Sequence, residues 1–166
     1  MKFSAIRVDY HRAYAAAVLA DFAGSFNPKV VEAAYGLGFP RPLLSGDRLY
    51  TYHSHGIIGW GRITPHPEEN AVFIGLGVWP ARARQGWRKD IRAHLASVAF
   101  QECNEFPVRQ VIIGVLTTNI EHLARCQHEA VDGGPWRSSG VVWYPPPGHY
   151  LFTLTKGDFG RIVEGL

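Results

Sequence analysis

The chain has 166 residues, 46% of them hydrophobic and 13% aromatic, which excludes a disordered chain and is enough for a sizeable core. Its net charge of +3 and pI near 9.0 suit an anionic ligand, but no run of Lys and Arg exceeds two residues, which argues against a nucleic-acid-binding protein. Two cysteines exclude a disulfide scaffold, and neither a signal-peptide core nor the ~20 apolar residues of a membrane span is present, so we expect one cytoplasmic domain over residues 1–166 that does not enter a membrane.

The first third of the chain predicts one strand and two helices. Phe3 to Val8 alternates like a strand, and a helix follows from Tyr10 to Phe22. A second helix is expected from Pro28 to Tyr35, because Asn27 is a good N-cap and proline suits the first helical position. The predicted buried face of the first helix consists of Tyr14, Val18 and Phe22.

A series of strands is predicted next. The stretch "DRLYTYHSHGIIGWGRI" has the pattern of two strands joined by a tight turn at His55-Gly56. The segment "PHPEEN" is a polar loop, and Ala71 to Val78 is the following strand. Together these segments indicate antiparallel hairpins.

Helices and strands alternate in the second half. A helix is expected from Arg88 to Cys103, and "VRQVIIGVL" has the continuous apolar character of a central strand buried on both faces. Another helix is predicted over "TTNIEHLARCQHEA", where Thr118 and Glu121 have capping-box spacing. Two last strands lie in "GVVWYPPPGHYLFTLTK", divided by three prolines. The fold class is therefore α/β (α+β).

The stretch "GLGVWPARARQGWRKDIRAHL" predicts a strand, a basic turn and a helix in direct succession. A helix start presents unpaired N–H groups and a partial positive charge, which suit a phosphate. The turn and the first helical residues add four basic side chains, those of Arg82, Arg84, Arg88 and Lys89. A solvated basic turn that caps a surface helix is the alternative.

The element order, together with two segments, resembles the GNAT superfamily of N-acetyltransferases over nearly the whole chain. "LGVWPARARQGW" is similar to the family's strand end and pyrophosphate loop, with Val78, Pro80 and Gly86 at matching positions. "VIIGVLTTNIEHLA" is similar to the family's fifth strand and the asparagine after it, here Asn119. The resemblance implies a mixed central sheet of about six to seven strands flanked by about four helices, and direct transfer of an acetyl group from acetyl-CoA to an amine.

The resemblance also implies which residues bind acetyl-CoA. Main-chain N–H groups near Leu76 to Val78 would stabilise the thioester oxygen, and Asn119 would hold the pantetheine arm. The diphosphate would be held by the loop and helix start, Arg82, Arg84, Gln85, Gly86, Trp87 and Arg88. The family loop usually has Arg or Gln, two residues, Gly, one residue, then Gly or Ala. Here those positions are Ala83, Gly86 and Arg88, and Arg84 stands where a further glycine is common.

Residues for proton transfer depart from the family pattern. Cys126 occupies the position seven residues after Asn119, where family members often have a tyrosine that protonates the CoA thiolate. A thiol of pKa about 8.5 can protonate a thiolate of similar basicity, but free cysteines are so often buried that the role of a small hydrophobic residue is favoured for Cys126. Tyr144 and Tyr150 are further candidates for this acid.

The base that deprotonates the amine is not evident on the strand from Ala71 to Val78, which has no acidic residue. The nearest substitutes are His53 and His55, with acids on the flanking loops at Asp47, Glu68 and Glu69. His53 and His55 are expected to share a strand face, an arrangement that also suits a metal, but no third ligand has a fitting spacing. We therefore expect no metal site.

Partner classes remain open. The aromatic residues of the first two helices, Tyr14, Phe22 and Tyr35, would line an acceptor cleft or belong to the core. The runner-up function is a catalytically weakened protein of the same architecture that binds and modulates a protein partner. Residues such as Trp136, Trp143 and Tyr144 would anchor the partner if they are exposed, but ordinary packing is the favoured interpretation of them. The sequence leaves open a monomer and a homodimer.

Overall fold

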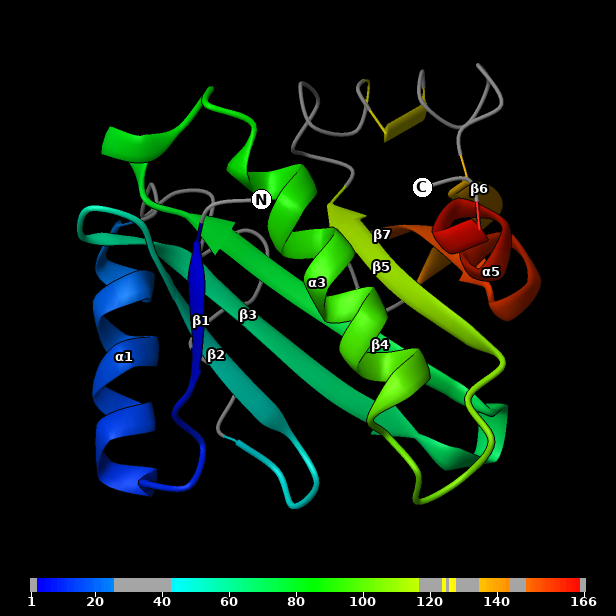
Figure 1. Ribbon diagram of the computed structural model, residues 1–166, viewed down its shortest axis with the longest axis horizontal. Coiled ribbons are helices and arrows are strands. Elements are labelled where there is room, and N and C mark those ends of the chain that lie inside the picture. The colour runs from blue at the N-terminus through cyan, green and yellow to red at the C-terminus, as the bar shows by residue number, and fades with distance from the viewer. Residues whose placement is uncertain are drawn as a thin grey trace.

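The computed structural model describes residues 3–25, 43–116, 124, 126, 127, 135–143 and 149–164 (Figure 1). The strands are β1 (Ser4–Arg7), β2 (Arg48–His53), β3 (Ile57–His66), β4 (Ala71–Val78), β5 (Gln110–Leu116), β6 (Arg137–Trp143) and β7 (His149–Thr155). The helices are α1 (Arg12–Ser25), α3 (Trp87–Gln101) and α5 (Lys156–Glu164), with short 3-10 turns at Pro67–Glu69 and Pro80–Arg82.

All described strands form one seven-stranded sheet in the order β1-β2-β3-β4-β5-β7-β6. Neighbouring strands are antiparallel except for β4 and β5, which are parallel. A parallel pair needs a crossover, and α3 supplies it by passing over the sheet between the two strands (Figure 1). The predicted mixed α/β sheet is thereby confirmed. It consists of two antiparallel groups, β1 to β4 and β5 to β6, that meet at the single parallel pair.

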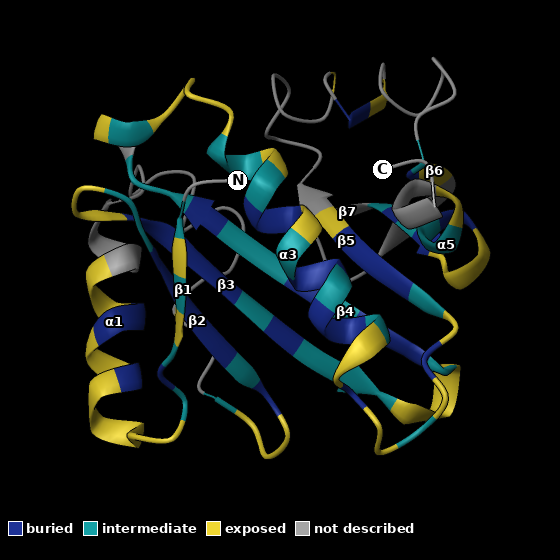
Figure 2. Cartoon of the chain, in the orientation of Figure 1, coloured by how far each residue is buried: buried dark blue, intermediate teal, exposed yellow. Residues whose placement is uncertain are grey.

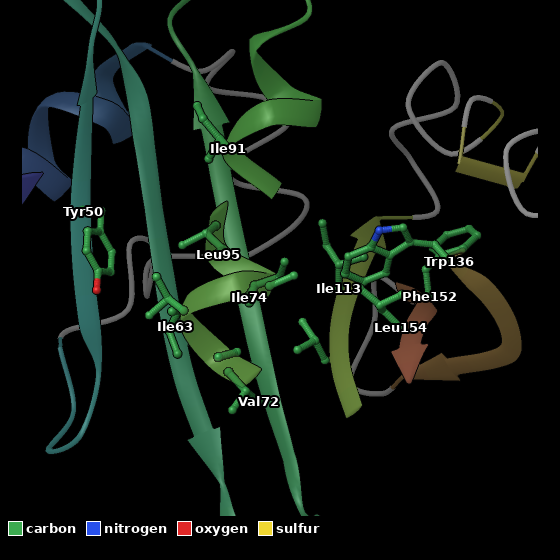
Figure 3. Packing of buried hydrophobic residues seen from close by; sticks show 14 of the residues in the cluster. Tyr50, Ile63, Val72, Ile74, Ile91, Leu95, Ile113, Trp136, Phe152 and Leu154 are labelled. Atoms are coloured by element: carbon green, nitrogen blue, oxygen red, sulfur yellow. The ribbon is translucent and has the colours of Figure 1, made fainter. Parts of the chain in front are cut away.

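The larger hydrophobic cluster lies between α3 and the sheet (Figure 3). Ile91 and Leu95 recur at helical spacing on the buried side of α3, as the sequence predicts. They pack on side chains from the central strands, among them Ile63, Val72 and Ile74. Burial of apolar surface at about 25 cal/mol per Å² makes this cluster the main stabilising contact of the helix.

The other face of the sheet packs against α1. Ala15, Val18 and Leu19 of the helix form a cluster with Leu49 and Trp60 of the strands, and Figure 2 shows the alternation of buried and exposed positions along α1. The prediction that Tyr14 belongs to the buried face is wrong, because 53% of this residue is exposed. The helix is rich in alanine, with apolar residues around its whole circumference, so spacing alone does not select the buried side. The side chain of Phe22 is not described, so its predicted burial stays a prediction.

The structure confirms some of the other predicted strands and helices and corrects others. The hairpin is confirmed, with His55 and Gly56 both at positive φ, 53° and 103°. The strand Ala71–Val78 is confirmed at both ends, whereas β3 extends to His66, so the expected polar loop is shorter. The helix α5 was not predicted. The predicted helix from Pro28 to Tyr35 and most of the helix over residues 117–130 lie outside the described residues.

Trp136 is not an exposed anchor. Only 6% of it is accessible, and its ring lies 5.3 Å from the guanidinium carbon of Arg92 in a cation–π contact. The residue therefore contributes to the core beside α3, which confirms the favoured interpretation of ordinary packing and excludes an anchoring role for this side chain. Trp143 and Tyr144 have no described side chain.

Candidate functional site

The parallel strands β4 and β5 separate toward their carboxyl ends. They pair over four residues, Ala71–Ile74 with Gln110–Ile113, although β4 continues to Val78 and β5 to Leu116. Figure 1 shows the two strands diverging beyond this ladder, with the first turn of α3 near the point of divergence. In α/β sheets, the carboxyl ends of parallel strands are a preferred place for ligands. The candidate site is therefore at the separating ends of β4 and β5.

Main-chain groups of β4 face this separation. The N–H of Trp79 donates to the Ile58 carbonyl at 2.9 Å, and the regular β3–β4 register directs the main chain of Gly77 to β3 as well. Because successive residues of a strand alternate in direction, Leu76 and Val78 point their N–H and C=O groups toward the β5 side. Both residues lie beyond the last pair of the β4–β5 ladder. An oxygen atom placed between the strands would thus meet main-chain donors.

Strands β3 and β4 approach each other closely at this end of the sheet. A Cβ built on Gly59 would lie 2.1 Å from the carbonyl oxygen of Gly77 and 3.1 Å from the Cα of Val78. No side chain fits at position 59 without displacement of the β4 backbone that carries the main-chain donors. The close approach therefore fixes the position of β4 beside the candidate site.

The basic turn between β4 and α3 has two residues in the left-handed region, Arg84 at φ 64° and Gly86 at φ 84°. Gly86 is the N-cap of α3, and it supplies no side-chain hydrogen bond to the helix. The first N–H groups of α3 are accordingly not capped by this residue and can face an anion. Arg84 is exposed and has no ion-pair partner within the described parts of the chain. Gln85 accepts a hydrogen bond from Trp87 Nε1 at 2.9 Å, which connects the turn to the helix start.

Arg82 has a different environment from the other basic residues of the turn. Its Nη2 donates to the Ser54 carbonyl at 2.7 Å, and its Nη1 donates to the His55 carbonyl at 3.4 Å. The guanidinium thus lies on the β2–β3 turn, and a phosphate would have to compete with these carbonyls for it. Arg88 makes contacts of its own at the helix start.

The two candidate histidines do not share a strand face. His53 is the last residue of β2, and its Nε2 lies 2.9 Å from Thr51 Oγ1 on the same face of the strand. His55 lies beyond the strand, in the turn, with a positive φ that ends the two-residue alternation. The predicted histidine pair is therefore wrong, and His53 alone remains on the sheet. It lies two strands away from β4.

Cys126 is helical and only 5% exposed, within the larger hydrophobic cluster. This burial supports a packing role; its part in proton transfer stays a prediction. Asn119, which would hold the pantetheine arm, lies outside the described residues, as does Tyr144. The side chain of Tyr150 is also not described.

A buried tyrosine of β2 and a half-buried histidine in the middle of α3 form a pair that the sequence did not indicate. The Tyr52 hydroxyl lies 2.8 Å from His94 Nδ1, with the Phe3 ring edge-on to both at 5.1 and 6.1 Å. Burial raises the pKa of Tyr52 and lowers the pKa of His94, so both are neutral, and the hydroxyl and Nδ1 share one hydrogen bond. Phe3 also meets Trp87, the first residue of α3, at 6.4 Å. Helical spacing of His94 behind Ile91 is the one signal in the sequence that could have placed this histidine inward.

No group of three or more His, Cys, Asp or Glu gathers among the described residues in a way that could hold a metal ion. Within the same ranges, no helix has the length and apolarity that crossing a membrane requires.

No family model matches this sequence, and no curated protein matches it significantly. Solved structures do match. ElaA of Escherichia coli superimposes with a TM-score of 0.63 at 10% identity, over 92% of this chain and 98% of that chain. The spermidine N-acetyltransferase of Vibrio cholerae, in complex with CoA and spermine, gives a TM-score of 0.66 at 9% identity, over 95% and 98%. The spermidine/spermine N-acetyltransferase SpeG of the same organism, with manganese ions, gives 0.64 at 9% identity, over 97% and 96%.

Identities near 10% show a shared fold. The superpositions extend over nearly the whole length of this chain and of the matched chains. The chain therefore has the fold of the GNAT N-acetyltransferases.

Proposed function

We propose that the chain is an acetyl-CoA-dependent N-acyltransferase that transfers an acyl group directly to an amine of a small molecule or a protein. The observation that carries this proposal is the separation of β4 and β5 beyond Ile74, with the main-chain groups of Leu76 and Val78 directed into it. Structures of the same fold include one in complex with CoA and spermine, which supports the ligand class.

The residues at the site fit such a ligand. The N–H groups of Leu76 and Val78 would donate to the thioester carbonyl oxygen, where negative charge grows as the amine attacks. The first turn of α3, which has no side-chain cap from Gly86, would face the diphosphate with its N–H groups, and the exposed guanidinium of Arg84 would add a charge-assisted contact. Asn119 would hold the pantetheine arm.

Two protons must move in this reaction. The attacking nitrogen loses one as its bond to the carbonyl carbon forms, and the CoA sulfur gains one as its bond to that carbon breaks. His53 is the proposed base, and because it is two strands from β4 it would act through water. Cys126 is the proposed acid.

Calorimetric titration with acetyl-CoA tests the proposal, followed by detection of the CoA thiol in the presence of a panel of amines. We expect saturable binding in the micromolar to millimolar range and thiol release that requires an amine. Arg84→Glu should weaken binding, whereas Lys156→Glu, a charge reversal at the distant start of α5, should leave it unchanged. The absence of heat and of any thermal shift at millimolar acetyl-CoA would remove this function.

Two observations favour the alternative of a weakened enzyme that modulates a protein partner. Arg84 places a side chain at a left-handed position that suits glycine, and β4 presents Phe73, Gly75 and Gly77 on the face opposite α3, with no acid. Tight acetyl-CoA binding without thiol release over the whole amine panel would select this alternative.

A further inference from the structure

The β2–β3 turn and the β4–α3 turn are far apart in the chain but are held together by one side chain. Arg82 donates to the carbonyls of Ser54 and His55 at 2.7 and 3.4 Å. Its Nη1 lies 4.0 Å from the place that a Cβ on Gly56 would occupy, so the guanidinium also covers the glycine of the turn.

Main-chain bonds continue this connection on both sides of the arginine. The N–H of Arg82 donates to the Trp79 carbonyl at 2.8 Å and closes the short turn after β4. The N–H of Trp79 donates to the Ile58 carbonyl at 2.9 Å, directly after the β2–β3 turn. Residues 79–82 are therefore fixed to residues 54–58 at three points.

The residues that follow Arg82 are those that face the candidate site. Arg84 and Gly86 both have positive φ, and α3 begins directly after them. The path of this segment depends on where residue 82 is held. The two carbonyls orient a planar guanidinium through two different nitrogens, which a single ammonium group cannot reproduce.

We propose that Arg82 is a positioning residue, which shapes the β4–α3 turn by binding the β2–β3 turn and does not contact the diphosphate. The statement about the diphosphate rests on the proposed function, which assigns this ligand to the β4–α3 turn. The positioning itself is a property of the unliganded protein. The consequence is that Ser54–Gly56 and Ala81–Gly86 form one unit, in which disturbance of either segment loosens the other.

Hydrogen exchange of the full chain, without ligand, tests the unit directly. In Arg82→Gln, amide exchange should accelerate about tenfold or more in both segments, because hydrogen bonds from a charged donor are lost. Arg84→Gln is the matched control: it removes the same charge from the same turn and should leave exchange at Ser54–Gly56 unchanged. Gly56→Ala alters the partner turn through its φ of 103° and should accelerate exchange at Ala81–Gly86. Melting curves confirm that each variant is folded.

Titration with CoA at low and high salt completes the test. Arg82→Gln should weaken binding about tenfold at both salt concentrations, whereas the effect of Arg84→Gln should shrink as salt screens its contact. Unchanged exchange in unliganded Arg82→Gln, together with a salt-dependent loss of CoA affinity, would overturn the proposal and make Arg82 a phosphate ligand. If the unaltered protein binds no CoA, the proposed function fails, and the exchange data still decide whether Arg82 positions the turn.

Discussion

Replacement of Gly59 by alanine should destabilise the protein strongly. The new Cβ would lie 2.1 Å from the Gly77 carbonyl oxygen and 3.1 Å from the Cα of Val78, so β3 and β4 must move apart by about 1.3 Å to reach ordinary contact. Both neighbours are backbone atoms within a paired strand, which cannot rotate away. We expect a loss of about 3 kcal/mol in the free energy of unfolding. For a domain of this size, this loss lowers the melting temperature by about 6–12 °C.

Two further glycines make this a graded series. A Cβ on Gly75 would meet ring carbons of Trp60 at 3.9 Å, an ordinary contact, so Gly75→Ala should change stability by less than about 1 kcal/mol. A Cβ on Gly61 would lie 2.8 Å from the methyl carbons of Leu95, which can shift, and an intermediate loss is expected. Urea unfolding of the three variants measures the order. Equal stability of Gly59→Ala and Gly75→Ala would refute the close approach of β3 to β4.

Three other perturbations have outcomes set by the structure. Asp47 has a side chain only 1% exposed and pairs with Arg62, so Asp47→Asn should lower the free energy of unfolding by about 3 kcal/mol in urea; a loss below about 1 kcal/mol would contradict a buried pair. Burial lowers the pKa of His94, so the unfolded chain binds a proton more readily than the folded chain, and the free energy of unfolding should fall as pH drops below about 6.5. His94→Gln should reduce this pH dependence when denaturation is measured at pH 7.5 and 5.5. An unchanged pH dependence would mean that other groups cause it. Arg84→Glu should weaken acetyl-CoA binding at least tenfold in calorimetry, and unchanged affinity would exclude this side chain from the phosphate contacts.

The strands and α3 could be predicted because their signals are local. Ala71–Val78 is bounded by a polar turn and by Pro80, and the buried residues of α3 recur at helical spacing. The helix α5 was missed because Gly157 and Gly160 lower its helix propensity, and in the structure the ring of its Phe159 stacks on Phe100 of α3. The buried side of α1 was wrong at Tyr14 because alanine on every side leaves the choice of face to tertiary packing.

The candidate site was predictable only in part. The strand–turn–helix sequence and Gly86 identified the basic turn, and its left-handed glycine is present. The role of Arg82 depends on its hydrogen bonds to two carbonyls of the β2–β3 turn, which are 27 and 28 residues away in the chain. No local sequence pattern can predict a contact over this separation. The Tyr52–His94 pair likewise joins residues 42 positions apart. Contacts of this kind arise from the sheet order, which brings distant segments to one end of the fold.

The four-residue length of the parallel ladder also has a consequence for folding. Pairing from β1 to β4 and from β5 to β6 is antiparallel, whereas β4 and β5 are parallel and join Ala71 to Gln110, 39 positions apart. This junction closes a loop of similar length to the one closed where Gln110 pairs with Thr155 of β7, but it gains four residue pairs where β5 and β7 gain seven. All four strands of the N-terminal group precede β5 in the chain, so this group can assemble during synthesis before β5 leaves the ribosome, and docking of β5, β7 and β6 completes the sheet.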